Sequence, residues 1–263
     1  MNLRDLFVFF LKDSAWIRKF LMGGAFCIVS LYSLFFRFLW GEGMFTLLFI
    51  YVILGGFVAL MLFPLGYGSR LLKMTFEKQD SQLPEWKDWP ELFKEGIKIF
   101  LVGLIYGLAV AIVIMGISFF AAKIPVLGAL FSFLYIVTGF LMVVSSPFIA
   151  IAICQVIASG KFSSAFDFPG IYKEFLEKAE DYIAVSLLLM GVKTVMEISL
   201  GSFGYSYLHS GALWAMRDSF PLVKLLSPFA TFWFLITVLR GYGKIYMKNK
   251  SSENLTGSAS DGA

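Results

Sequence analysis

Long runs of apolar residues alternate with shorter charged segments along this chain of 263 residues. A helix needs about 20 mostly apolar residues to cross the ~30 Å hydrocarbon core of a bilayer. Six runs reach roughly that length, with ends defined to within a few residues: Phe20–Trp40, Met44–Leu65, Ile97–Phe120, Pro125–Val156, Tyr182–Gly204 and Leu222–Leu239. The pattern predicts an all-α protein, a polytopic transmembrane helical bundle with about six spans.

The Lys and Arg residues are distributed unevenly among the connections between these runs. Seventeen of them lie before the first run, in residues 66–98, after the fourth run and after the sixth; four lie at or near the opposite ends of the runs (Arg37, Lys123, Arg217 and Lys224), and Lys193 lies inside a run. Cytoplasmic loops of membrane proteins carry such an excess of positive charge. We therefore expect a multi-pass protein of the cell membrane with both termini in the cytoplasm, in which residues 66–96 form a cytoplasmic hairpin.

The two ends of the chain have patterns of their own. Residues 249–263 are small and polar, which is typical of a disordered cytoplasmic tail. Near the N-terminus, apolar residues share one helical face: Leu3, Leu6, Phe7, Phe10 and Leu11. Arg4, Asp5 and Lys12 lie on the opposite face, so we expect an amphipathic helix in the membrane interface. Residues 1–248 then form a single transmembrane domain.

Composition supports the membrane class and narrows the chemistry. Hydrophobic residues make up 59% of the chain and charged residues 15%, against roughly 45–50% and about 25% in soluble domains. The net charge of +4 comes from residues that flank apolar runs, which argues against a nucleic-acid partner. Cys27 and Cys154 have no paired spacing, and His209 is the one histidine. We therefore expect no metal, cofactor or catalytic residue, and the sequence favours a protein that is not an enzyme.

The predicted hairpin contains a helix start with a recognisable sequence. The residue before Pro84 is expected to be extended, which separates two helical segments. Asp88 is a good N-cap, because Pro90 falls in the first turn and Glu91 lies three residues on, the spacing of a capping box. The helix that begins there is expected to run on into the third apolar run.

Two interpretations of this hairpin remain open. In the first, the hairpin holds two membrane spans at the correct depth in the bilayer, with its tryptophans at the level of the lipid headgroups. Alternatively it forms a docking surface for a protein partner or for lipid headgroups. The candidate residues of that surface are basic, aromatic and acidic: Arg70, Lys73, Trp86, Lys87, Asp88 and Trp89.

The same stretch carries a resemblance to a known family. Gly66-Tyr67-Gly68, the segment LPEWKDWPELFKEGIK and the following apolar run with Tyr106 resemble the core signature of a prokaryotic integral membrane family, domain of unknown function 4013. WIRKFLMGG (Trp16–Gly24) and ASGKFSSAFDF (Ala158–Phe168) extend the resemblance. It implies a multi-spanning helical architecture and brings no assigned activity.

Short internal similarities are present as well. Gly66-Tyr67-Gly68 recurs as Gly241-Tyr242-Gly243, and Ser146-Pro147-Phe148 recurs as Ser227-Pro228-Phe229. Transporters often contain internal repeats. Matches of three residues favour chance and shared interface chemistry over duplication.

The fifth apolar run contains two opposite charges, Lys193 and Glu197. Four residues apart on a helix, they share one face and are spaced to pair. A charge at bilayer depth costs about 2.5–3.5 kcal/mol, so such residues usually face a bundle interior or a wet cavity. The pair is therefore a candidate polar site on an ion or substrate path. The alternative is a neutralised pair that serves helix packing.

These patterns lead to two main functional hypotheses. The first is a non-enzymatic membrane protein that acts as an interaction protein, a subunit or a lipid-contacting scaffold, with the hairpin as the surface for a protein partner. The alternative is a small transporter or channel that uses Lys193 and Glu197. An intramembrane enzyme is a third and weaker hypothesis.

Gly103 and Gly107 have the spacing of close helix contacts, but the sequence leaves open whether their partner is in the same chain or a second copy.

Overall fold

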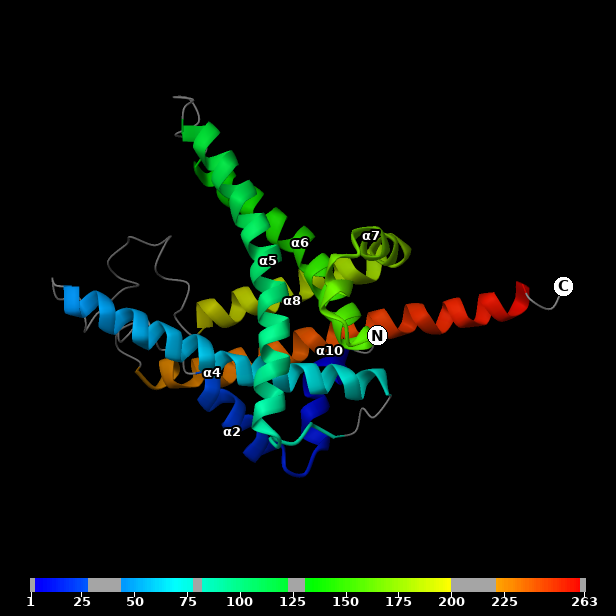
Figure 1. Ribbon diagram of the computed structural model, residues 1–263, viewed down its shortest axis with the longest axis horizontal. Helices are drawn as coiled ribbons and strands as arrows, with labels where there is room; N and C mark the ends of the chain where they lie inside the picture. Colours follow the sequence, from blue (N-terminus) through cyan, green and yellow to red (C-terminus); the bar gives the residue numbers. More distant parts are fainter. Residues whose placement is uncertain (1–2, 28–43, 78–81, 123–130, 200–220, 261–263) are drawn as a thin grey trace. The chain divides into compact units, whose positions relative to one another are not determined.

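The computed structural model describes residues 3–27, 44–77, 82–122, 131–199 and 221–260 (Figure 1). All regular structure in these ranges is helical, which confirms the all-α class. The elements, in order along the chain, are α1 (Leu3–Val8), the 3-10 helix η1 (Phe9–Lys12), α2 (Trp16–Phe26), α4 (Met44–Phe76), α5 (Trp89–Ala122), α6 (Phe131–Ser159), the 3-10 helix η4 (Phe162–Phe166), α7 (Phe168–Glu177), α8 (Ala179–Ser199) and α10 (Pro221–Ser260).

The helices follow the apolar runs and extend beyond several of them. α4 continues past the second run to Phe76, and α5 begins at Trp89, directly after the predicted cap at Asp88. α10 includes residues 249–260 of the predicted tail. The connection after the fourth run contains a ten-residue helix, α7, that the search for apolar runs did not predict. Parts of the first, fourth and fifth runs lie outside the described residues.

One segment of the described chain, Trp89–Ile117 in α5, is long and apolar enough to cross a membrane. Only 11% of its most apolar window is buried. A shorter apolar helical segment covers Val143–Ser159 in α6.

The contacts within the predicted domain 1–248 group into two compact units. Unit 1 comprises Met1–Ile97 and Gly191–Arg240, and unit 2 comprises Lys98–Met190 and Gly241–Ala263. Each unit is therefore assembled from two separate stretches of the chain.

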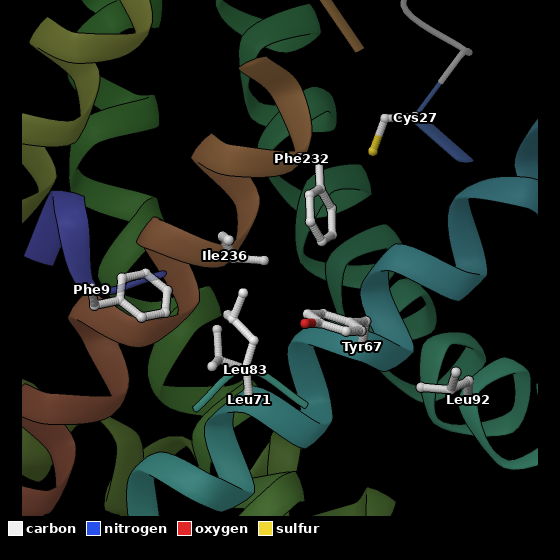
Figure 2. Close-up of a cluster of buried hydrophobic side chains, with 8 residues drawn as sticks. All are labelled: Phe9, Cys27, Tyr67, Leu71, Leu83, Leu92, Phe232 and Ile236. Carbon is white, nitrogen blue, oxygen red and sulfur yellow. The ribbon is translucent and has the colours of Figure 1, made fainter. Parts of the chain in front are cut away.

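The core of unit 1 contains side chains from η1, α4, α5 and α10, from the segment between α4 and α5, and from the C-cap of α2 (Figure 2). The buried cluster comprises Phe9, Cys27, Tyr67, Leu71, Leu83, Leu92, Phe232 and Ile236. Two glycines bring the backbones of α4 and α5 together. A Cβ atom at Gly66 would lie 1.8 Å from the carbonyl oxygen of Leu92, and one at Gly96 would lie 1.9 Å from that of Leu62. Only glycine fits at either position without moving the backbone.

The N-terminal segment packs within unit 1. Leu6 is fully buried, and Phe9 is 3% exposed. The Trp233 indole of α10 donates to the carbonyl of Phe7 over 3.2 Å, and the Arg240 guanidinium donates to the carbonyl of Asp5 over 2.7 Å. Much of the apolar face predicted for a membrane interface is therefore used for contacts inside the protein.

Unit 2 is held by a cluster of hydroxyl groups. Pro147 lies inside α6 and has no N–H to donate to the carbonyl of Val143. The Ser146 hydroxyl donates to that carbonyl over 3.1 Å and also contacts the hydroxyls of Ser186 (3.2 Å) and Tyr242 (3.1 Å). Ser186 and Tyr242 are 2.7 Å apart. The cluster joins α6, α8 and α10 without a formal charge.

Candidate functional site

Arg70 holds the extended segment that precedes α5. We call residues 62–77 and 82–96 the α4–α5 corner. The Arg70 guanidinium donates to the carbonyls of Lys87 (2.6 Å), Glu85 (3.3 Å) and Asp88 (3.3 Å). One nitrogen also lies 3.7 Å from the Asp88 carboxylate. The planar fork of donors on arginine suits several acceptors at once, so one side chain fixes the backbone turn.

Asp88 adopts an unusual backbone conformation at the start of α5. Its φ is +53°, in the left-handed region that aspartate tolerates better than most residues. Its carbonyl accepts the N–H of Leu92 over 3.0 Å, which begins the helix. The positive φ gives the chain a sharp turn into α5 within the reach of Arg70.

Trp86 is enclosed by other aromatic rings. It stacks on Tyr67 with ring centroids 4.3 Å apart, and its ring lies 5.5 Å from Phe26. Its indole N–H donates to the carbonyl of Lys19 over 3.0 Å. The Tyr67 hydroxyl in turn donates to the carbonyl of Pro84 over 3.0 Å. Trp86 therefore forms part of the packing of the corner.

A buried ion pair ties the N-terminal segment to the same corner. Asp13 accepts from Lys19 Nζ and from the N–H of Leu83, each over 2.8 Å, and from the N–H of Ala15 over 2.7 Å. Lys19 also donates to the carbonyl of Leu83 over 2.7 Å. Burial alone would raise the pKa of Asp13, but the hydrogen bonds from Lys19, Leu83 and Ala15 together hold that pKa below its ordinary value.

Sequence reasoning missed this role of Asp13 and Lys19. The two residues are six positions apart and lie 64 to 70 positions from Leu83, so their contacts with the corner leave no periodic signal. The one local signal is an acidic residue just before a helix that begins at Trp16.

The residues predicted to form a docking surface divide into two groups. Arg70 and Trp86 bind within the corner, as described above. Lys73 on α4 forms an ion pair with Glu95 on α5, whose side chain is 9% exposed. The others face outward: Lys87, Asp88 and Trp89 are exposed. The outward group is the candidate contact surface, and we call it the corner tip.

The charges of the corner tip are partly neutralised by neighbours. Lys87 Nζ lies 2.7 Å from a carboxylate oxygen of Glu85, and both side chains are largely exposed. The hydrogen bond and the positive charge of Lys87 lower the pKa of Glu85, and the same contact raises the pKa of Lys87. Trp89 lies beside these charges with 38% of its surface exposed.

Lys193 and Glu197 lie one helical turn apart on α8. Lys193 is exposed. The side chain of Glu197 lies outside the described part of the structure, so a contact between the two stays a prediction. Across the residues that the structure describes, no group of three or more His, Cys, Asp or Glu side chains has the arrangement of a metal site.

Comparison with known proteins identifies the family. The family model described as "Protein of unknown function (DUF4013)" matches residues 44–204. The chain belongs to this family. No curated protein matches, and no solved structure matches.

The DUF4013 match covers α4 through α8 and therefore contains the whole α4–α5 corner. The resemblance inferred from the signature around LPEWKDWPELFKEGIK is thereby confirmed at the level of the family. Asp13, Lys19 and α10 lie outside the match, although they pack on the corner or beside it. The stabilising contacts of the corner thus extend beyond the part of the chain that the DUF4013 model describes.

Proposed function

We propose that this protein is a non-enzymatic, multi-pass membrane scaffold. It contacts lipid along α5 and binds a protein partner through the corner tip. The proposed arrangement has about six spans in the cell membrane and both termini in the cytoplasm. The N-terminal segment then lies at the membrane interface, where Val8 and Leu11 are exposed.

The outward face of α5 carries the proposal. Large apolar side chains are exposed along it: Leu101, Leu104, Ile105, Leu108, Ile112, Val113, Met115, Ile117 and Phe119. The core helix of a soluble protein has a similar length and composition but is mostly buried. Here Leu108 is 53% exposed, and Ile112 and Met115 are 68% and 70% exposed. A row of this kind is rare on soluble proteins, and a bilayer would cover it.

The rigidity of the corner supports the interaction role. Arg70, Trp86 and Tyr67 fix the backbone of residues 84–88 from the inside. Trp89 and Lys87 are consequently presented outward on a segment that has little freedom left to lose on binding. Preorganisation of this kind lowers the entropic cost of association, and exposed tryptophan is enriched among residues that dominate protein interfaces.

Labelling of introduced cysteines tests the membrane part of the proposal. The native thiols of Cys27 and Cys154 are buried, so a membrane-impermeant maleimide should leave the wild-type protein largely unmodified. Lys87→Cys should react only when the cytoplasmic side is accessible. Leu108→Cys should stay unreactive from both sides until the membrane is dissolved. Equal reaction of both variants in sealed vesicles would contradict the proposal.

Extraction in mild detergent tests the scaffold part. The wild-type chain should elute as a complex larger than its own detergent-bound monomer. The double variant Lys87→Gln, Trp89→Ala should elute as the monomer while it is still folded, at a temperature below an unfolding transition that is expected to fall because Trp89 also packs against Phe26 and Phe63. Glu77→Gln, an exposed change beside the end of α4, should leave the complex intact. A wild-type chain that elutes alone and crosslinks to nothing would refute the interaction role.

A small transporter or channel is the second candidate function. It is favoured by the placement of Lys193 and Glu197 one turn apart on α8, within an otherwise apolar stretch. Flux of ions into proteoliposomes that Glu197→Gln abolishes would support this function. Equal leakage in wild-type and variant vesicles would refute it.

A further inference from the structure

An eight-residue pattern occurs twice in the chain. Residues 88–95 read DWPELFKE, and residues 167–174 read DFPGIYKE. Both contain Asp, an aromatic residue, Pro, a variable residue, an aliphatic residue, an aromatic residue, Lys and Glu in the same order. The match is longer than the tripeptide similarities elsewhere in the chain, and it includes the helix start of the α4–α5 corner.

In both copies a helix begins directly after the aspartate, although the backbone differs there: φ is +53° at Asp88 and −76° at Asp167. α5 begins at Trp89 and α7 begins at Phe168, each directly after the aspartate of the pattern. In the second copy the Asp167 side chain accepts the N–H of Gly170 over 3.2 Å as a helix cap. The aliphatic residue is buried in both, with Leu92 fully buried and Ile171 1% exposed.

The helices that precede the two copies also correspond. Pro64 lies inside α4, twelve residues before its last residue, Phe76. Pro147 lies inside α6, twelve residues before Ser159. We therefore call residues 147–175 the α6–α7 corner, the counterpart in unit 2 of the α4–α5 corner in unit 1.

The two copies continue differently. α5 runs on for 34 residues, whereas α7 ends at Glu177 after ten. α7 leaves one row of apolar side chains uncovered. Phe168, Tyr172 and Leu176 are 60%, 57% and 55% exposed. Spaced four residues apart, they form a stripe along one face of the helix.

This stripe adjoins the exposed apolar surface of α5 within unit 2. The Tyr106 hydroxyl on α5 donates to the carbonyl of Ala165 over 2.6 Å. The rings of Tyr106 and Phe168 lie 6.3 Å apart. Ile105 and Leu108, next to Tyr106 on α5, are exposed. An occupant that covers the side of α5 at this level therefore meets the start of the α7 stripe.

We propose that α7 lies in the headgroup boundary of the bilayer, with the Phe168–Tyr172–Leu176 stripe toward the acyl chains. The inference rests on the proposed membrane location of α5. Helices with an apolar stripe and a charged opposite face bury that stripe about 5–10 Å into the interface. Lys173, whose side chain is 72% exposed, lies beside the stripe and forms an ion pair with Glu177 at 3.7 Å, so a charged pair flanks the apolar stripe. Continuity with α5 favours lipid over a protein partner as the occupant.

Spin labels on the full-length protein in vesicles of mixed neutral and anionic lipid test this placement. A nitroxide is attached at Tyr172→Cys, Leu176→Cys, Lys173→Cys or Leu108→Cys, with mock-labelled wild type as the control. Collisions with oxygen report lipid, and collisions with a water-soluble nickel complex report water. The ratio of oxygen to nickel collisions should be several-fold higher at Tyr172→Cys and Leu176→Cys than at Lys173→Cys, and highest at Leu108→Cys.

Each alternative has its own result. If the labels at Tyr172→Cys and Leu176→Cys collide with nickel as often as the label at Lys173→Cys, the stripe faces water and the inference is wrong. If they collide with neither reagent, a protein surface or a second copy covers the stripe, and the inference is again wrong. A water-exposed label at Leu108→Cys would instead overturn the membrane location of α5, and with it the proposed function.

Discussion

The α4–α5 and α6–α7 corners begin from the same pattern and are stabilised in different ways. Eight residues after the aspartate, the first has Gly96 and the second has Phe175. Gly96 lets the carbonyl of Leu62 approach the helix backbone, whereas the Phe175 ring packs on Phe148 with centroids 4.7 Å apart. At this position the first corner is therefore held by a contact between backbone atoms, and the second by a contact between side chains.

The hydrogen bonds and ion pairs that hold the two corners differ as well. The α4–α5 corner is fixed by charged groups, the Asp13–Lys19 pair and Arg70, acting on its backbone. Near the α6–α7 corner the described contacts include neutral hydroxyls, a contact of the Tyr182 hydroxyl with the Glu174 carboxylate at 3.3 Å, and the Lys173–Glu177 pair within α7 at 3.7 Å. The comparison teaches that one short pattern specifies a helix start and a buried aliphatic residue. The strength of the surrounding contacts is set by residues outside the pattern.

The largest loss of stability is expected from removing the buried ion pair of the first corner. Asp13→Ala leaves Lys19, whose side chain is 12% exposed, without its carboxylate and the N–H of Leu83 without its acceptor. Breaking one partner of a buried pair costs about 3–5 kcal/mol. Thermal unfolding in detergent should show a clear loss, while Lys12→Ala, which breaks the exposed pair of Lys12 with Asp5, should cost less. Equal losses would show that the Asp13 pair is not what distinguishes this corner.

The same pair predicts a dependence on pH. Because the folded-state pKa of Asp13 lies below its ordinary value, its stabilising contribution is complete above the unfolded-state pKa of about 4 and disappears as the pH falls through the folded-state value. The difference in stability between the wild type and Asp13→Asn should therefore be constant from pH 6 to pH 7 and shrink below pH 4. A constant difference down to the lowest accessible pH would refute this assignment.

A substitution at Gly96 tests the backbone contact directly. In Gly96→Ala the added Cβ would lie 1.9 Å from the carbonyl oxygen of Leu62, so a helix must shift. Overpacking of this kind costs about 1–3 kcal/mol. Gly103→Ala on the same helix meets nothing within 4 Å and should be neutral or slightly stabilising, because alanine favours helix. If both variants unfold at the same temperature, the close contact of α4 and α5 is not a source of stability.

The smallest effect is expected in unit 2. Ser186→Ala removes the hydroxyl that lies 2.7 Å from Tyr242, but Ser146 remains 3.1 Å from that tyrosine. The expected loss is about 1 kcal/mol, the usual net value of one hydrogen bond. Ser163→Ala, on an exposed side of η4, is the matched control. A loss as large as that of Asp13→Ala would mean that the neutral cluster is as strong as the charged one.

Local sequence rules predicted where several helices lie. The segment Asp88–Glu91 predicted the start of α5 at Trp89, although Asp88 has a φ of +53° and not the extended backbone of a usual N-cap. The family was identified from the segment around that start. The short α7 was missed because the search used the length of a membrane span, and ten residues fall below it. Comparing residues 167–174 with residues 88–95 would have revealed it.

The contacts of the candidate site could not be predicted in the same way. Arg70 was one candidate for a partner or headgroup surface, and in the structure it donates to three backbone carbonyls of residues 85–88. Every residue has a carbonyl acceptor, so the sequence does not indicate which carbonyls a guanidinium will contact. Trp86 was expected at headgroup level, but its stacking on Tyr67 depends on the turn that Arg70 fixes. The outward orientation of Lys87 and Trp89 is a consequence of the same turn.

Unit 1 is built from two separate stretches of the chain, and this affects when it can fold during synthesis. Residues 1–97 leave the ribosome before unit 2 begins, yet their partners on α10 are translated after residue 220. Arg240, 1% exposed, reaches back to the carbonyl of Asp5 and lies 4.0 Å from the Phe9 ring. The packing of the first helices therefore stays incomplete until nearly the whole chain has been synthesised. Nascent chains halted before residue 230 should be far more sensitive to proteases at their N-terminus than chains released at full length.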